Sequence, residues 1–487
     1  MSDQNDGSWS DETPESAEPN EPGVDAVVSV EEVGLGYEEF AAEADDLVYV
    51  EGLSPAEAAE VAALEVDPDA VVGGPAFAET STVAKTWALF AGIALIMVGN
   101  GLQGVLLGVR SANEGFGIGV TGLVMTCYFI GFFFGTSYAE RALGSVGHIR
   151  VFAALASTAS SAALIHAISV TPVTWAIMRF LFGLCMAGLY VVAESWLNDL
   201  ATNANRGRLL SIYMVVTMAG MASGQFLLNV ADPNGFTLFV VASVLVSLAL
   251  VPITLSAASA PPLRTPEKIG FKELIEIVPT GAYVAFLGGA AAGTLVGLGA
   301  VYAAAVGMSD SRIAIFLAAP LFGGLVMQWP IGRLSDAVPR RGVMIVVAIA
   351  ATAASVALVA VDEGSWAAVA VMFVVGGTNF PLYALGIAHT NDWLPYEKIN
   401  GAAALLVRVN GAGAVVGPVT AAILMAAVGP VMFFWVLVGT HAAIALFLGY
   451  RIVIADAVPI DRQRTFQAWP ARASQLAVQL IPKRRRP

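Results

Sequence analysis

Twelve apolar runs of about 20 residues follow one another from residue 87 onward, and this feature constrains the fold more than any other. A helix rises 1.5 Å per residue, so a run of about 22 residues spans about 33 Å, the thickness of a bilayer's hydrocarbon core. The predicted spans are 87–109, 117–139, 149–170, 173–197, 208–229, 236–256, 279–302, 312–334, 342–361, 365–388, 402–427 and 430–450. No strand-length alternation competes with this pattern. The sequence therefore predicts an all-α polytopic membrane protein with twelve transmembrane helices.

The composition excludes several other classes of protein. Apolar residues make up 57% of the chain and charged residues 13%, whereas a soluble domain has about 45–50% and about 25%. Two cysteines without a CxxC pair exclude a disulfide framework and a cysteine metal site. No Walker A, HExxH, nucleophile-elbow or Cys/His cluster pattern is present. We therefore expect no enzymatic activity, no cofactor, no metal and no nucleic-acid partner.

The first 80 residues form an acidic tail with 22 of the 38 acidic residues and no Lys or Arg. Such a segment buries too little apolar surface to offset its ordering entropy, so disorder is predicted. The capping-box spacing from Ser54 to Glu57 predicts one short helix over 55–64. No basic region precedes an apolar run at the start, so a secretory signal is not expected. Two interpretations stay open: a solvating appendage, or a docking tail for a basic partner or for the protein's own basic loops.

The rest of the chain carries 16 acidic and 24 basic residues, and its cations lie mostly on one side of the predicted membrane. Alternate connections and the C-terminal tail hold Arg141, Arg150, Arg206, Arg208, Arg264, Lys268, Lys272, Arg340, Arg341, Lys398 and the group from Arg451 to Arg486. The opposite connections hold Arg110 and Arg312. The positive-inside rule therefore places both termini in the cytoplasm of a bacterium, with the protein in its inner (plasma) membrane. The basic tail, 452–487, is expected to contact anionic membrane lipids.

The body is divided by its longest connection, 257–278, into two six-helix bundles, 85–256 and 279–451. A repeated pattern links the two halves. Gly183, Leu189, Tyr190, Asn198 and Asp199 have the same spacing as Gly376, Leu382, Tyr383, Asn391 and Asp392. The repeat predicts a duplication and two pseudo-symmetric bundles around a central substrate site.

Several motifs resemble those of the major facilitator superfamily. The segment from Gly332 to Arg341 resembles its G-x-L-x-D-R-x-G-R-R signature, although Ala337 and Pro339 depart from it. The first half has a looser copy with Glu140 and Arg141. The segment Arg179-x3-Gly183-x3-Ala187 resembles the R-x-x-x-G-x-x-x-A motif of the superfamily. The YcaD-like branch is indicated by the segments Glu194-Ser195-Trp196, Arg206-Gly207-Arg208, Pro381-Leu382-Tyr383 and His389-Thr390-Asn391-Asp392. The resemblance covers about 85–455 and implies the major facilitator fold and a permease, without implying a substrate.

Ionisable groups inside spans are costly and are functional candidates by default. The resemblance implies a role near the ion or proton pathway for Arg179, whose alternative role is a strut between helices. Glu194 lies near the basic end of its span. It is expected to take up a proton, to pair with Arg208 or Arg408, or to form a plain interfacial ion pair. No Asp or Glu lies near the middle of a span, so proton coupling stays a hypothesis.

Polar side chains within the spans are candidates for the substrate cavity. Asn100 and Gln103 share one helix face near mid-membrane, where an unpaired amide is costly. Asn379, Asn410, Gln225 and Gln328 are weaker candidates of the same type. Arg408 is a further candidate and lies about two turns inside its span.

A second group of residues is expected to gate the conformational change. Asp336, Arg340 and Arg341, with Gly332, form the motif of the second half, and Glu140 and Arg141 belong to the first-half copy. A carboxylate at a helix end can accept bonds from a neighbouring helix while arginines clamp the other half. His389, Asn391 and Asp392 end the tenth span and are expected to act in the gate or as structural bonds.

The expected function is therefore secondary transport by alternating access, with a small organic solute or a hydrophobic compound as substrate. A different class of function is a non-transporting membrane scaffold or sensor that acts through the acidic tail. An intramembrane enzyme is a distant third, because no nucleophile and base can be assembled from the sequence.

Overall fold

The computed structural model describes residues 76–201, 205–254, 270–454 and 458–466. It divides into two compact units, Met1–Thr80 and Ser81–Pro487, and the fold described below is that of the second. The acidic tail with its predicted helix over 55–64, most of the 257–278 connection and most of the basic tail lie outside the described residues.

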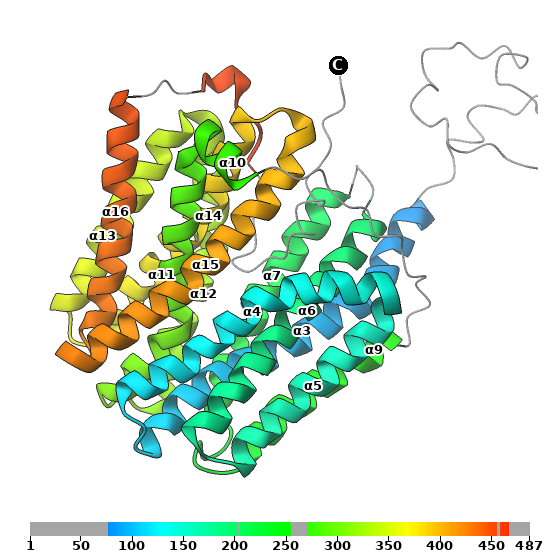
Figure 1. The fold of residues 1–487 in the computed structure, drawn as a ribbon, viewed down its shortest axis with the longest axis vertical. Coiled ribbons are helices and arrows are strands. Elements are labelled where there is room, and N and C mark those ends of the chain that lie inside the picture. Colours follow the sequence, from blue (N-terminus) through cyan, green and yellow to red (C-terminus); the bar gives the residue numbers. More distant parts are fainter. Residues whose placement is uncertain (1–75, 202–204, 255–269, 455–457, 467–487) are drawn as a thin grey trace, which may run out of the picture. The chain divides into compact units, whose positions relative to one another are not determined.

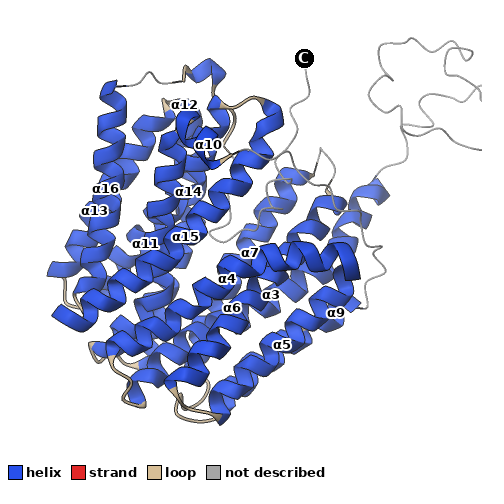
Figure 2. Cartoon of the chain, viewed as in Figure 1, coloured by secondary structure: helices blue, strands red, loops and turns tan. Residues whose placement is uncertain are grey.

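All regular elements of the described residues are helical (Figure 2), which confirms the predicted fold class. The first half contains α3 (Ala76–Asn113), α4 (Ile118–Val146), α5 (His148–Ile168), α6 (Pro172–Leu200), α7 (Arg206–Phe226), η2 (Leu227–Asn229), α8 (Thr237–Leu248) and α9 (Leu250–Thr254). The second contains α10 (Phe271–Ile277), α11 (Pro279–Ala305), α12 (Asp310–Ala337), α13 (Arg340–Ala360), α14 (Trp366–Trp393), α15 (Tyr396–Val428), α16 (Met432–Ile454) and η3 (Ile460–Arg462).

The sixth predicted span differs from the other eleven. Eleven helices of the described residues are long and apolar enough to cross a membrane, whereas 236–256 is represented by the shorter apolar segment Thr237–Ile253. This segment is interrupted at Ala249, between α8 and α9. Pro252 explains the interruption, because it has no N–H to donate to the carbonyl of Leu248 and its ring crowds that carbonyl.

The two halves repeat the same helix packing. In the first half α4 packs mainly against α6, and in the second half α12 packs mainly against α14. A Cβ atom at Gly183 would overlap the Tyr128 carbonyl, and a Cβ at Gly376 would overlap the Pro320 carbonyl. The repeated glycine of each half therefore brings two helix backbones together, as small residues do in membrane helix packing.

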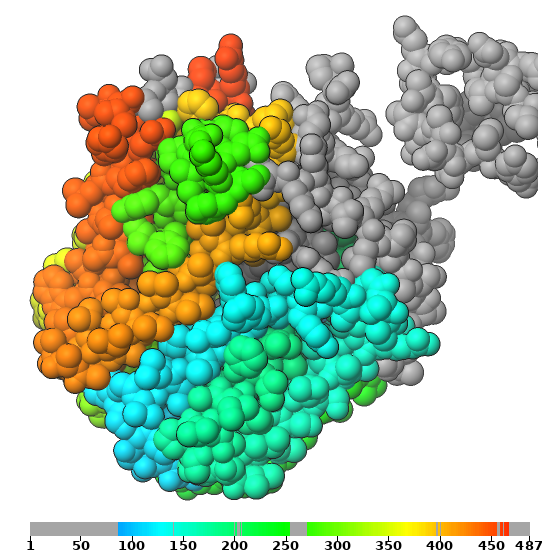
Figure 3. Space-filling view, in the orientation of Figure 1, coloured from blue at the N-terminus to red at the C-terminus, as the bar shows by residue number. Residues whose placement is uncertain are grey.

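The halves meet along α4 and α15, and along α7 and α12. In the space-filling view, atoms of α15 (orange) lie directly against those of α4 (cyan) (Figure 3). We call the end that holds the α4–α5 and α12–α13 connections the basic end, and the other the opposite end. The ribbons of the two halves converge toward the opposite end and spread apart toward the basic end (Figure 1).

Close contacts seal the opposite end. A Cβ at Gly122 of α4 would be stopped by Ala422 of α15, and the Ser311 hydroxyl donates a 2.7 Å hydrogen bond to Asn229 Oδ1 across the halves. The described hydrogen bonds at the basic end stay within one half or the other. The structure is thus closed at the opposite end.

The glycine contact gives a first prediction. Gly183→Ala places a methyl group against the backbone of α4, so the helices must separate, and the free energy of unfolding should fall by about 1–3 kcal/mol. Gly439→Ala is the matched control, because Gly439 of α16 has open space around its Cβ position. Thermal unfolding of the purified protein should show a lower midpoint for the first variant alone. Equal midpoints would contradict this packing.

Candidate functional site

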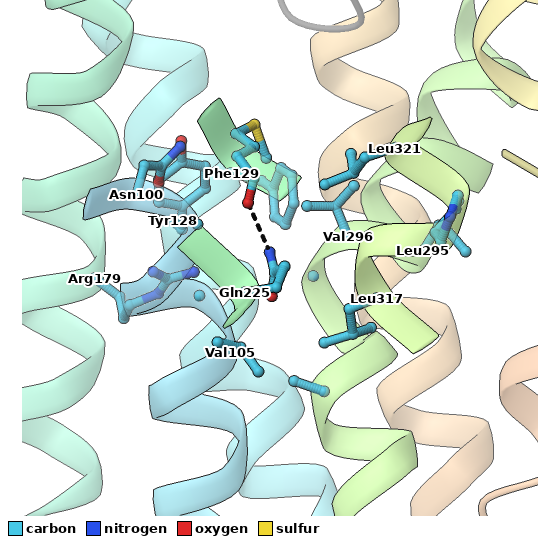
Figure 4. A pocket seen from close by; sticks show the side chains of 16 residues that line it. Asn100, Val105, Tyr128, Phe129, Arg179, Gln225, Leu295, Val296, Leu317 and Leu321 are labelled. Carbon is cyan, nitrogen blue, oxygen red and sulfur yellow. Dashed lines mark hydrogen bonds between the residues drawn. The ribbon is translucent and has the colours of Figure 1, made fainter. Parts of the chain in front are cut away.

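A cavity between the halves, which we call the Arg179 cavity, lies midway along the helices (Figure 4). Its lining residues are Asn100, Gly101, Gly104, Val105, Tyr128, Phe129, Arg179, Met221, Gln225, Leu295, Val296, Gly297, Ala300, Leu317, Pro320 and Leu321. The polar and charged side chains in this set all come from the first half. The second half, through α11 and α12, contributes only apolar residues and glycine. The cavity therefore has one polar wall and one apolar wall.

Arg179 dominates the polar wall. Its guanidinium lies 4.7 Å from the centre of the Tyr128 ring, and its side chain is buried. The ring face of an aromatic residue attracts a cation, most strongly where water is excluded. Arg179, Gly183 and Ala187 follow one face of α6, and Ala187 packs against Gly135 of α4. The close approach of α4 and α6 thus places the cation on the ring.

A second cavity, the Asn410 cavity, adjoins the first and shares Phe129, Met221, Val296 and Leu321 with it. Its other lining residues are Phe132, Tyr190, Thr217, Met218, Ala292, Gly293, Phe380, Tyr383, Val407, Asn410, Gly411 and Ala414. Apart from Thr217, Asn410 and the two tyrosine hydroxyls the lining is apolar, and it has no charged side chain.

The sequence repeat reappears in this cavity. Tyr190 and Tyr383, which hold the same place in the two repeated patterns, both line it from opposite halves. The Tyr190 hydroxyl donates to Met97 Sδ at 2.9 Å, and Asn410 Nδ2 donates to the Ala285 carbonyl at 3.0 Å. The duplication therefore supplies matching aromatic groups to one shared space.

The predicted cavity residues are not all brought together. Asn100 lines the Arg179 cavity and Asn410 lines the second cavity, whereas Gln103 is fully buried and lines neither. Asn379 faces α16, where its Oδ1 lies 3.1 Å from His441 Nε2. Arg408 is exposed on α15 and is not among the lining residues. The weaker candidate Gln225 does line the Arg179 cavity.

The cavity's aromatic residues were not singled out from the sequence. Tyr128 and Phe129 of α4 line the Arg179 cavity, and Phe129 also lines the Asn410 cavity together with Phe380 of α14. Aromatic residues are common on all faces of membrane helices, so composition alone does not mark them. Tyr190 and Tyr383 could have been identified from the sequence, because they hold equivalent positions in the repeated pattern.

Glu194 is a fully buried carboxylate near the basic end of α6. The Tyr213 hydroxyl of α7 donates a 2.8 Å hydrogen bond to its Oε1. The neighbouring Ser195 hydroxyl lies 2.8 Å from His148 Nε2 of α5. Arg208 and Arg408, the two predicted arginine partners, are exposed. The hydrogen bond from Tyr213 is one of the contacts of Glu194, and it joins α6 to α7.

The gating motif of the second half contacts a short C-terminal segment, 458–466, which we call the C-terminal strap. Arg340 is 1% exposed and donates to the carboxylates of Asp392 and Asp336, and also to the Arg464 carbonyl at 2.6 Å. In return the Arg464 N–H donates to Asp392 Oδ1 at 2.8 Å, and the Phe466 N–H donates to Asp336 Oδ1 at 2.7 Å. The motif and the strap form one network.

Other predicted gate residues surround this network. Gly332 lies under the Phe466 ring, which a Cβ atom would strike. Arg341 is buried, donates to the Arg451 carbonyl at 3.4 Å and lies 5.6 Å from the centre of the Trp393 ring. His389 packs edge-on against that ring. All these contacts are internal to the second half.

The remaining gate candidates stand apart from the network. Asn391 is buried in α14, and Arg141 is exposed at the basic end of α4. The side chain of Glu140 lies outside the described residues. Near the same end, Lys398 donates to Glu273 Oε1 at 2.6 Å, and this hydrogen bond holds the pKa of the Glu273 carboxyl below its usual value.

Comparison with known protein families shows which family the chain belongs to. The family model described as the Major Facilitator Superfamily matches residues 89–309 and 281–485. The chain is a member of the major facilitator superfamily. The first match covers the first half and continues through α11, and the second match covers the second half.

Relatives place the chain in the YcaD-like group of this superfamily. It is 26% identical over 329 residues to an uncharacterized MFS-type transporter of Yersinia enterocolitica, covering 67% of this chain and 85% of that protein. It is 24% identical over 339 residues to the uncharacterized MFS-type transporter YcaD of Escherichia fergusonii, covering 69% and 88%. The recognition made from the motifs is thereby confirmed, and the chain belongs to a family of membrane transporters.

Solved structures show the same fold at low sequence identity. The nucleoside transporter NupG matches with a TM-score of 0.63 and 10% identity, over 76% of this chain and 99% of that one. A bacterial homolog of the human lysosomal transporter Spinster, in an inward-facing and unoccupied conformation, matches with a TM-score of 0.57 and 15% identity, over 79% and 98%. At these identities the likeness extends to the fold alone.

Proposed function

We propose that the protein is a secondary active permease that moves a small organic solute or a hydrophobic compound by alternating access. The observation that carries this proposal is the pair of cavities between the two halves, closed at the opposite end by contacts such as Ser311 to Asn229. A cavity at the junction of two bundles can be opened to either side by rocking one bundle against the other. Membership of a transporter family supports the same function.

The basic end is assigned to the cytoplasm of a bacterial plasma membrane, and with it both termini. The support for this assignment is the distribution of cations. Arg141, Arg150, Arg340, Arg341 and Lys398 all lie at the basic ends of their helices. By the positive-inside rule such connections remain on the cytoplasmic side.

The motif of the second half is proposed to act as a conformational gate. Asp336 and Arg340 lie where α12 turns into α13, and their bonds are made to groups of the second half. Rocking of the bundles would require these groups to exchange partners. The motif therefore acts in the conformational change between the two open states, and the residues of the cavities contact the substrate.

Proton coupling is proposed through Glu194. It is a fully buried carboxylate that accepts a hydrogen bond from Tyr213 of α7, and α7 packs against α12 of the second half. A buried carboxyl group can change its protonation when its surroundings change. Rocking of α7 against α12 would change those surroundings.

The cavity assignment is tested by ligand-induced stabilisation. A ligand that binds the folded state stabilises it by about 2.7 kcal/mol at a hundredfold excess over Kd, so a panel of metabolites and drugs should raise the thermal midpoint in a few cases. The shift should shrink in Asn410→Ala and persist in Val453→Ala, an exposed residue of α16. Such a ligand should also enter proteoliposomes, and its pH-dependent uptake should lose that dependence in Glu194→Gln. Ligands that stabilise all variants equally, or that never cross the membrane, would contradict the proposal.

A further inference from the structure

The Arg179 cavity joins one buried cation to a buried amide donor. Arg179 is 3% exposed, and it is the only charged side chain among the residues that line the two described cavities. Asn100 is 5% exposed and lines the same cavity, and its Nδ2 has no hydrogen-bond partner among the described residues. Figure 4 shows both side chains, with Tyr128, on the same wall. An anion placed there would be attracted by the cation through a medium of low dielectric.

The adjoining Asn410 cavity suits the uncharged part of such a ligand. Its walls include the rings of Phe132, Tyr190, Phe380 and Tyr383, and the two cavities join at Phe129. Aromatic walls favour flat, apolar groups, which gain both burial and ring contacts. The polar wall of the first cavity and the apolar second cavity therefore accommodate opposite ends of one molecule.

We propose that the substrate is an amphiphilic monoanion, such as an aromatic carboxylate. Its anionic group would lie at Arg179 and Asn100, and its apolar body would extend into the Asn410 cavity. This inference rests on the proposed transport function and specifies its substrate class. A cation would be repelled by Arg179, and a polyanion would bring uncompensated charge against apolar walls.

The substrate class is tested with three ligands that share one ring system and are anionic, neutral and cationic. The probes are 1-naphthoate, the neutral 1-naphthalenemethanol and the cationic 1-naphthylmethylammonium, titrated calorimetrically into the purified full-length protein. Naphthoate should bind most tightly. Arg179→Gln should raise its Kd about tenfold or more and leave the Kd of the alcohol unchanged, because the lost bond is charge-assisted. Arg150→Gln, at an exposed position of α5, is the control and should change neither value.

The substrate class would be overturned by equal binding of the alcohol and naphthoate, by tighter binding of the ammonium, or by a naphthoate Kd that Arg179→Gln does not change. Each of these results concerns the charge of the ligand and its contact with Arg179, so the permease proposal survives the failure. Absence of binding by all three probes would also overturn the class, while the stabilisation and uptake experiments test transport separately. If Arg179→Gln does not fold, Asn100→Ala gives the same comparison.

The C-terminal strap carries a second inference, from an independent observation. Backbone N–H groups of Arg464 and Phe466 bond to Asp392 and Asp336, and the Phe466 ring covers Gly332. The strap thus binds the carboxylates of the gating motif in this structure, in which the protein is closed at the opposite end. A segment that binds one conformation shifts the population toward it.

We infer that the strap holds the protein in the state with its basic ends apart. While the Phe466 N–H occupies Asp336 Oδ1, that oxygen is engaged within the second half. Release of the strap would let the motif exchange partners and would shift the population toward closed basic ends. The strap would therefore act as an internal regulator of the transport cycle.

Spin-label distances across the basic end test the strap. Labels are placed at Ser145→Cys and Val338→Cys, both exposed, after replacement of the two native cysteines. In the double variant Arg464→Ala and Phe466→Ala, which removes the Arg464 bond to the Leu394 carbonyl and the ring over Gly332, a population with shorter distances should appear. Thr465→Ala, an exposed residue, is the control. One unchanged distribution in all proteins would overturn the inference.

Discussion

The contact between the backbones of α4 and α6 is the interaction on which the rest of the site depends. Gly131 and Gly135 of α4 face Phe180 and Leu184 of α6, and Gly183 of α6 faces Tyr128. The backbones of α4 and α6 lie so close at these positions that only glycine fits. The contact therefore fixes how the two helices are aligned along their length. The register places Arg179 over the Tyr128 ring. The same contact between α12 and α14, at Gly323 and Gly376, repeats the arrangement in the second half without the cation.

Buried charged side chains have different surroundings at the cavity, in the first half and in the second half. Arg179 lies beside an aromatic ring at the cavity, Glu194 accepts from a phenol in the first half, and Arg340 lies between two carboxylates in the second. Charges in a membrane protein are costly and are retained where they have partners or a function. Arg340 donates to two carboxylates and one backbone carbonyl and is structural in this state. Arg179 lines a space between the halves, where a ligand's charge can reach it.

The sequence predicts the fold well because membrane spans have a strong signal. Length and hydropathy identify the helices, and the sixth was overestimated only because Pro252 interrupts an otherwise continuous apolar run. The repeat identified Tyr190 and Tyr383 as equivalent, yet it could not show that both face one cavity. The sequence could not show which polar side chains line a cavity. The three-residue spacing of Asn100 and Gln103 predicts that they share a helix face, but it does not show whether each one lines the cavity or packs against another helix. The strap could not be foreseen, because its bonds to Asp392 and Asp336 come from backbone N–H groups.

The proposed transport mechanism requires the cavities to open to the two sides of the membrane in turn. It is tested most directly by labelling Thr217→Cys, in the wall of the Asn410 cavity, with a membrane-impermeant thiol reagent from each side. A short thiol cross-link between Asn229→Cys and Ser311→Cys, which face each other across the opposite end, locks that end closed. With alternating access, labelling is expected from both sides before cross-linking and from the basic side alone afterwards. Equal labelling from both sides of the locked protein, or none from the opposite side of the unlocked protein, would contradict it.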